Sequence, residues 1–260
     1  MSISKGAPSR AQASLLAWIA DVGAVTAPAL AALQATTGSS ARARLAAAAR
    51  TGLATGWRPL AGEPALYTLT RAGLRRCELP GAAAVRVSPA NAAHLIACAR
   101  VAAVLARRYP DHAVLGERGL RRLEQQAGGA LASAVLGLGP GGEPLSHRPD
   151  LVLWPIDGKS LPVAVEVELT IKAPRRLAQI CRAWARCRDV AGVLYLAAPP
   201  VELPLARAIA EADAADAVVA LPLGALDSEE PAQSAVQPQA PVNPGEPSQD
   251  RRRVALGDRP

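Results

Sequence analysis

Three acidic residues interrupt an otherwise apolar stretch near the middle of this 260-residue chain. Asp150 precedes the run Leu-Val-Leu-Trp, and Glu166 and Glu168 occupy even positions in a segment, residues 161–169, whose odd positions are all Val or Leu. Because side chains alternate between the two faces of a strand, this pattern predicts both glutamates on one face. Carboxylate oxygens are the ligands that Mg²⁺ prefers, so the pattern favours a divalent cation site.

An Asp157-Gly158 pair between the two apolar runs is a strong turn signal, so we expect one antiparallel hairpin. Asp150 shares the face of Glu166 only if paired residue numbers add up to an even value, which requires an odd loop. A three-residue loop with Gly158 left-handed is a common solution. Three clustered carboxylates repel one another, so we expect Mg²⁺, with Mn²⁺ as its substitute, as the counter-ion.

The proline before Asp150 and the gap to Glu166-Val-Glu168 resemble the core of the PD-(D/E)XK nuclease superfamily, whose fold is α-β-β-β-α-β. The resemblance implies that Asp150 and Glu166 hold the cation. Glu168 stands where the superfamily usually has lysine, and Lys172 is a candidate for the missing positive charge. Glu168 or Lys172 would then orient or deprotonate the attacking water.

Two further groups are candidates for this site. Arg175 and Arg176 open a predicted amphipathic helix after the hairpin and would hold phosphate oxygens. The helix before the sheet often supplies a glutamate in this superfamily, and Glu117 is the candidate. A pairing of Glu117 with Arg121, four residues on, explains its position equally well.

Residues 1–86 carry ten Lys and Arg against three acidic residues, a surplus equal to the whole net charge of +7. We expect a helix that starts over residues 14–19 and a second at 27–36, with Thr26 as N-cap and Gly23 as the preceding break. A third helix has Ser39 or Ser40 as N-cap and ends near Gly52 or Gly56. The third projects arginines, and two short strands follow around a Gly-Glu-Pro turn. Thr70 then caps a last helical turn. The proposed phosphate contacts are Arg42, Arg44, Arg50 and Arg58.

The segment GWRPLAGEPALYTLTRAGLRR resembles bacterial winged helix-turn-helix domains, which implies double-stranded DNA as partner and allows a homodimer. A solvated basic helix is the simpler alternative. Farther along we expect a long helix from Pro89, a short extended piece at 112–115, a helix at 117–126, a first sheet strand at 131–138, and a strand at 193–197 parallel to the hairpin. A helix at 202–213 and a strand at 218–221 complete the predicted sheet.

The expected fold class is mixed α/β, and the predicted boundaries follow composition. They are a disordered start (1–11), a winged helix-turn-helix domain (12–80), a connecting helix (81–110), a PD-(D/E)XK-like domain (111–225) and a disordered Pro- and Arg-containing tail (226–260) whose Arg251-Arg252-Arg253 run is a candidate nucleic-acid contact.

Composition argues for a cytoplasmic protein without a membrane partner. No uninterrupted apolar run reaches the roughly 18 residues of a spanning helix, and Asp21 interrupts the apolar stretch near the N-terminus. The four cysteines have neither CxxC nor zinc-ligand spacing, so we expect buried free thiols.

The complete arrangement resembles the actinobacterial replication-relaxation family, associated with plasmid replication and mobilisation, across residues 12–225. The resemblance rests on the Tyr-Thr-Leu-Thr strand, the Glu117-Arg118 segment, HRPD and EVELT. It implies a DNA-binding protein with a nuclease-like domain, a Mg²⁺-dependent DNA endonuclease in one hypothesis and a non-enzymatic regulator or replication accessory factor in the other. A hydrolase relay of His147 with Ser146 and Asp150 is a weak third, because no nucleophile elbow is present.

Overall fold

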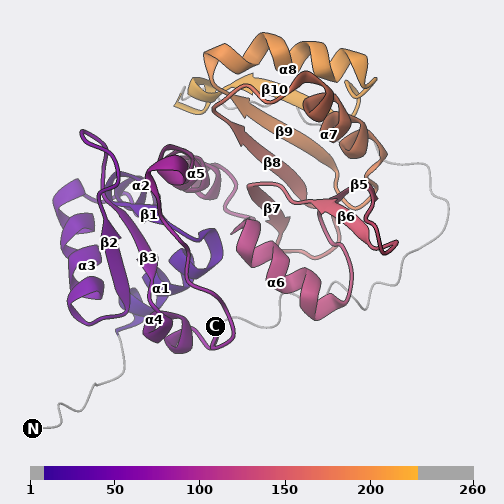
Figure 1. Ribbon diagram of the computed structural model, residues 1–260. Helices are drawn as coiled ribbons and strands as arrows, with labels where there is room; N and C mark the ends of the chain where they lie inside the picture. The colour runs from indigo at the N-terminus through magenta and orange to yellow at the C-terminus, as the bar shows by residue number, and fades with distance from the viewer. Residues whose placement is uncertain (1–8, 228–260) are drawn as a thin grey trace, which may run out of the picture. The chain divides into compact units, whose positions relative to one another are not determined.

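The computed structural model describes residues 9–227, which form two compact units with a boundary between Arg107 and Arg108. Both units contain helices and strands, so the mixed α/β class is confirmed (Figure 1). The predicted tail beyond residue 227 and its arginine run lie outside the described residues, as do residues 1–8. The predicted disorder up to residue 11 is wrong at its end: a helix begins at Arg10, because the Ser9 side chain caps it by accepting from Gln12 N.

Residues of the first unit form a small three-stranded antiparallel sheet with helices around it. The sheet order is β1-β3-β2, so the first strand pairs with the last. The elements are α1 (Arg10–Val22), β1 (Val25–Thr26), α2 (Ala27–Leu33), α3 (Gly38–Arg50), β2 (Ala54–Trp57), β3 (Leu66–Leu69), α4 (Arg71–Arg76) and α5 (Pro89–Arg108).

Threonine side chains cap three of these helices. Thr26 accepts from Ala29 N at 3.3 Å and Thr70 from Gly73 N at 3.1 Å, so both predicted caps are confirmed. The predicted cap of α3 is wrong by two residues, because Thr37 accepts from Ser40 N at 3.2 Å and the helix therefore starts at Gly38. Gly23 ends α1 with a positive φ of 91°, a conformation that glycine adopts without strain.

An apolar core holds the first unit together, with Leu15, Leu30 and Leu45 fully buried. Ala99 and Ala103 of α5 belong to the same core, so contacts assign this helix to the first unit rather than to a linker. Within residues 9–227, α5 alone has the length and composition to cross a membrane. Core helices of soluble proteins share those properties, so the length and composition of α5 are weak evidence for a membrane span.

The second unit contains a five-stranded sheet with the order β10-β9-β8-β7-β4. β4 (His112–Gly116), β7 (Leu151–Pro155) and β8 (Val163–Glu168) are antiparallel neighbours, whereas β9 (Gly192–Ala197) and β10 (Val218–Pro222) run parallel to β8. Helices α6 (Glu117–Ala127), α7 (Pro174–Arg186) and α8 (Pro199–Glu211) contribute apolar side chains to the core on one face of the sheet. A 3₁₀ turn, Leu223–Asp227, follows β10.

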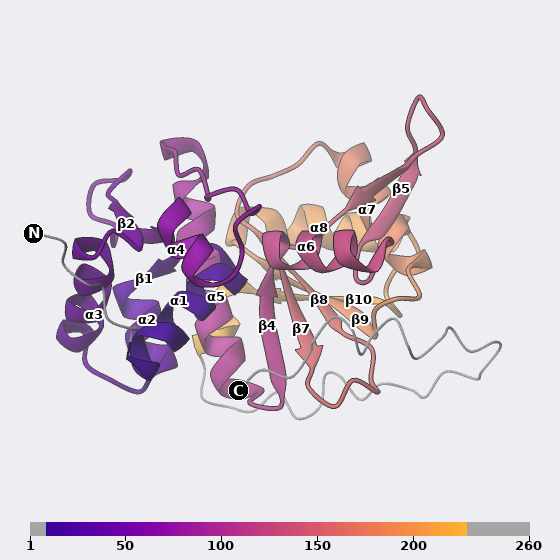
Figure 2. The ribbon, with the colours of Figure 1, turned by 90° about the horizontal axis from the view of Figure 1, so that it is seen from below.

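The first strand of this sheet is not the predicted one. Residues 131–138 contain β5 (Ala134–Leu138), which pairs with β6 (Pro144–His147) in a separate two-stranded sheet; Figure 2 shows this hairpin extending away from the larger sheet. β4, predicted only as a short extended piece, takes the place beside β7. Gly137 shifts the register of β5 and Leu138 is 69% exposed, whereas Val114 and Leu115 of β4 are buried.

The hairpin has the even register that the predicted shared face of Asp150 and Glu166 requires. Leu151 pairs with Val165 and Leu153 with Val163, so both pairs of numbers add up to 316, an even value. Gly158 is left-handed at φ 64°, as expected. The connection between Pro155 and Val163 is seven residues, odd as predicted but longer than a three-residue loop.

Candidate functional site

Glu166, on β8, is a buried carboxylate held at one oxygen by two donors from different elements. His147 Nε2, at the end of β6, lies 2.7 Å from Glu166 Oε1, and Trp184 Nε1, on α7, donates to the same oxygen at 3.1 Å. The two rings meet edge to face with their centroids 5.8 Å apart. Three elements distant in the sequence therefore fix the orientation of this carboxylate.

Burial raises the pKa of Glu166 above its ordinary value, while the hydrogen bond and charge of His147 act in the opposite direction. The negative charge of Asp150 raises the pKa further, and the positive charge of Lys172 lowers it. Both hydrogen bonds end on Oε1, so Oε2 of Glu166 has no hydrogen-bond partner within residues 9–227. The free oxygen is the one available to a proton or a cation.

Asp150 lies directly before β7, and its carboxylate caps the neighbouring strand. Its Oδ2 accepts from Val167 N at 2.8 Å, and its backbone carbonyl accepts from Glu117 N at 3.0 Å. These bonds tie the start of β7 both to β8 and to the first residue of α6. The side chain is half-buried and near enough to affect the pKa of Glu166.

Glu168 is also buried, at 5% exposure, and forms an ion pair with Lys172. Lys172 belongs to the segment between β8 and α7 and is half-buried. Its charge acts on both Glu166 and Glu168, so a lysine does lie among these carboxylates although the usual motif position holds glutamate. The sequence-based suggestion that Lys172 supplies the positive charge is consistent with this placement.

The carboxylates of Asp150, Glu166 and Glu168 share one end of the hairpin without converging on a point. Across the described part of the chain, their oxygens do not form a group lying within 4.8 Å of one another. Their mutual repulsion is instead relieved by His147, by Lys172 and by the Val167 N–H. The expected divalent counter-ion thus remains a prediction, and the protein supplies positive charge of its own.

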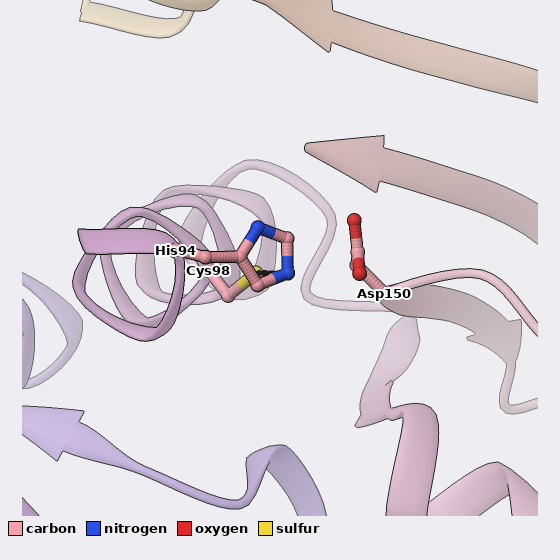
Figure 3. A group of neighbouring side chains, drawn as sticks. All are labelled: His94, Cys98 and Asp150. Atoms are coloured by element: carbon pink, nitrogen blue, oxygen red, sulfur yellow. Dashed lines mark hydrogen bonds between the residues drawn. The ribbon is translucent and has the colours of Figure 1, made fainter. Parts of the chain in front are cut away.

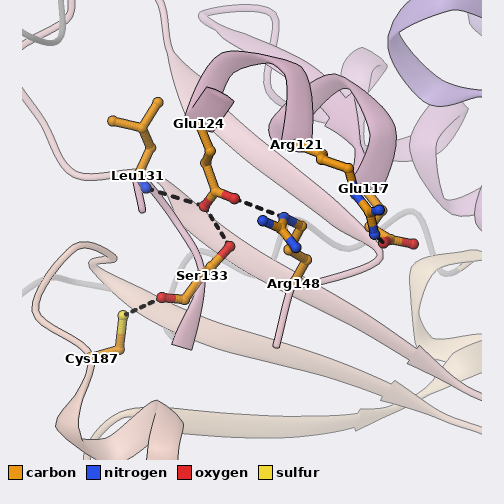
Figure 4. Close-up of polar contacts among 7 residues, drawn as sticks. All are labelled: Glu117, Arg121, Glu124, Leu131, Ser133, Arg148 and Cys187. Atoms are coloured by element: carbon orange, nitrogen blue, oxygen red, sulfur yellow. Dashed lines mark hydrogen bonds and ion pairs between the residues drawn. The ribbon is translucent and has the colours of Figure 1, made fainter. Parts of the chain in front are cut away.

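Glu117 and Glu124 occupy the same side of α6 with opposite surroundings (Figure 4). Glu117 is half-exposed and pairs with Arg121 at 2.7 Å, the alternative that its spacing allowed. Glu124 is 5% exposed and accepts from Arg148 Nε at 2.7 Å, from Leu131 N at 3.2 Å and from the Ser133 hydroxyl. Sequence reasoning missed Glu124, although its spacing of seven from Glu117 placed it on the inward stripe.

The buried neighbours of Glu166 are neutral groups. Burial, with a smaller contribution from the charge of Glu166, raises the pKa of Cys181 to about 11, and the same causes raise the pKa of Tyr195. Cys181 is therefore a protonated thiol at neutral pH and a poor nucleophile. The relay of His147 with Ser146 and Asp150 is also not formed, because the His147 hydrogen bond runs to Glu166.

In the first unit, three of the four predicted phosphate-binding arginines are exposed. Arg42 and Arg50 lie on α3, and Arg58 directly follows β2. Within residues 9–227 none of these three has an acidic partner. Arg44 differs, since it is half-buried and donates to Gln34 Oε1, which connects α3 to the end of α2.

Arg175 and Arg176 lie exposed in the first turn of α7, shortly after Lys172. Arg176 Nη1 donates to Gln179 Oε1 at 3.0 Å, an interaction confined to the helix. Positive side chains at a helix N-terminus add to the positive end of the helix dipole. The combination gives the second unit a surface segment suited to phosphate.

A separate polar contact lies on α5, where His94 and Cys98 are one turn apart with Nε2 and Sγ 3.4 Å from each other (Figure 3). Sequence reasoning assigned His94 no role. Both residues belong to the first unit, whereas the carboxylate cluster is built entirely from residues of the second.

Comparison of the chain with protein-family models, with curated proteins and with solved structures gave no match. The geometry described above and the sequence motifs therefore carry the functional argument.

Proposed function

We propose that this chain is a cytoplasmic, double-stranded DNA-binding protein of the replication-relaxation type. In this proposal the first unit is a winged helix-turn-helix domain, and the second is a PD-(D/E)XK-like domain with a divalent cation site. The observation that carries it is that Arg42 and Arg50 on α3 are exposed and have no acidic partner within residues 9–227.

The order of elements in the first unit supports a winged helix. One helix, a short strand, two helices and two strands follow one another along the chain. The short first strand, β1, pairs antiparallel with β3. Arg44 connects α3 to α2 through Gln34, whereas Arg42 and Arg50 are exposed and have no acidic partner within residues 9–227. Such contacts position a helix on DNA and make binding dependent on salt.

The order of elements in the second unit supports a nuclease-like domain. Three antiparallel strands, β4, β7 and β8, are followed by α7 and by β9, which runs parallel to β8. Asp150 and Glu166 are the residues that would hold the cation, because they supply hard oxygen donors and Glu166 Oε2 has no protein partner within residues 9–227. A divalent cation bound there supplies Lewis acidity toward a phosphoryl oxygen. Arg175 and Arg176 would bind phosphate oxygens, and Lys172 would orient the attacking water.

A non-enzymatic DNA-binding regulator is the second candidate, and a specific observation favours it. Glu166 and Glu168 already have internal partners in His147, Trp184 and Lys172, so the fold does not need a cation to hold these acids. The same donors that stabilise a scaffold could also prepare a metal site. A cleavage assay separates the two candidates.

Two measurements test the proposal. Anisotropy of labelled duplex DNA should show binding by the full chain that weakens steeply with salt, and the double variant Arg42→Gln/Arg50→Gln should bind markedly less. Supercoiled plasmid incubated with Mg²⁺ or Mn²⁺ should be nicked by the native chain and left intact by Asp150→Ala. Salt-insensitive or absent DNA binding contradicts the first part, and binding without any cleavage selects the regulator.

A further inference from the structure

We infer that His147 and Trp184 are positioning residues. Their hydrogen bonds to Oε1 of Glu166 fix the carboxylate so that Oε2 is presented to a divalent cation. This inference rests on the proposed cation site of the second unit and adds two residues to it that lie outside its acidic motif.

The two donors restrict the carboxylate in a way that one could not. A carboxylate with a single hydrogen bond can rotate and exchange its oxygens, whereas donors at 2.7 and 3.1 Å from different elements fix Oε1. Trp184 is fully buried and the His147 side chain is 18% exposed, so neither donor is easily displaced by water. Their edge-to-face contact also fixes the two rings against each other.

The other oxygen of Glu166 has the opposite surroundings. Oε2 has no hydrogen-bond partner within residues 9–227, yet every fully buried side-chain nitrogen or oxygen in that part of the chain has one. Oε2 is therefore not completely enclosed, although the Glu166 side chain as a whole is only 6% exposed. A buried carboxylate with one oxygen held and one oxygen open is arranged as a monodentate ligand.

Hydrogen-bonded partners behind a metal ligand commonly change affinity by about 10- to 100-fold when they are removed. The alternative role for His147 is direct ligation through its imidazole nitrogen, which would require it to release Glu166. The two roles make different demands on the side chain. A glutamine at position 147 retains an N–H donor, but it is a much weaker ligand than imidazole.

Calorimetric titration of the EDTA-stripped, dialysed full chain with Mn²⁺, and then with Mg²⁺, tests the inference. We expect His147→Ala to weaken Mn²⁺ binding by at least about 10-fold and Trp184→Phe by several-fold, whereas His147→Gln should stay within about threefold of the native chain. His112→Ala is the matched control, because it removes another histidine–carboxylate contact, to Asp111 at 2.8 Å, and should leave affinity unchanged.

Urea unfolding of each variant in EDTA separates positioning from stability, since a purely structural residue lowers the midpoint without changing the affinity of the folded protein. Native affinity in folded His147→Ala overturns the inference, and equal losses in His147→Gln and His147→Ala overturn it in favour of direct ligation. If His147→Ala does not fold, unchanged affinity in Trp184→Phe overturns it. If the native chain binds neither cation, the proposed cation site itself is overturned. This outcome differs from failure of the inference about His147 and Trp184, because it is seen in the unmodified protein.

Discussion

The two units place their charge in opposite ways. Among the described residues, the first unit buries a single acidic residue, Asp21, and exposes Arg42 and Arg50 on α3 and Arg58 after β2. The second unit buries three carboxylates, Glu124, Glu166 and Glu168, each with named partners. A charged side chain at the surface keeps its hydration, so it costs little free energy and can adapt to an extended phosphate backbone. A buried charge loses its hydration and requires hydrogen-bond donors in fixed positions.

This difference predicts how each unit responds to substitution. Changing an exposed arginine should alter binding and leave folding nearly intact. Removing one partner of a buried carboxylate should alter folding first, because the remaining charge has lost its compensation.

Arg148→Met should produce the largest loss. It leaves Glu124 buried without its cationic partner, although Leu131 N and the Ser133 hydroxyl still donate to it. We expect the free energy of unfolding to fall by about 3 kcal/mol in urea titrations at pH 7. Arg121→Met, on the exposed pair of the same helix, is the control and should change it by less than about 0.5 kcal/mol. Equal effects of the two substitutions would refute the contrast between buried and exposed charge.

Arg42→Gln and Arg50→Gln should have the largest effect on binding. Each removes one surface charge that has no acidic partner in the described part of the chain, so each should reduce the slope of log affinity against log salt by about 1. Because both side chains are exposed, unfolding free energy should change by less than about 0.5 kcal/mol. Arg207→Gln, an exposed arginine on α8, is the control. A slope unchanged by the α3 substitutions would remove this helix from the DNA interface.

Local signals were sufficient to predict much of this fold. Thr26 and Thr70 cap helices because a threonine before a helix satisfies an amide three residues on, a relation contained within four residues. The even register of the β7–β8 hairpin also followed from local alternation and turn chemistry. The cap of α3 was misplaced because Thr37, Ser39 and Ser40 are all competent, and only the backbone path selects one of them.

Partners of the buried acids could not be predicted in the same way. Periodicity placed Glu166 on a face, but Trp184 reaches it from α7, 18 residues away, and His147 from a strand outside the main sheet. Spacing on α6 likewise gave Glu117 and Glu124 the same stripe without showing which of them is buried. Tertiary packing decides that question, and it buries the glutamate that meets Arg148.

Glu166→Gln tests the buried charge through its pH dependence. Because the pKa of Glu166 is raised in the folded state, folding favours its protonated form, and this contribution to stability is lost as pH rises above the unfolded value near 4.5. Glutamine is neutral throughout and still offers an acceptor to His147 and Trp184. In EDTA, urea titrations from pH 4.5 to pH 7 should therefore show the variant gaining stability relative to the native chain. A difference that does not change with pH would mean that the charge is fully compensated, and the reverse trend would mean that folding lowers the pKa of Glu166; either result contradicts the prediction.

Substitutions of Glu117 and Arg121 should have the smallest effect on the free energy of unfolding, and they test whether Glu117 is a cation ligand. Their side chains are 49% and 52% exposed, so a double-substitution cycle with glutamine at both positions should give a coupling of only about 0.3–0.5 kcal/mol in urea titrations. That coupling is the whole effect expected if Glu117 serves only its helix. If Glu117 is instead a cation ligand, as its superfamily position implied, Glu117→Gln should weaken Mn²⁺ binding by calorimetry while Arg121→Gln does not. We expect both single variants to retain native affinity, because the described contacts commit Glu117 to Arg121 and leave the open carboxylate oxygen at Glu166.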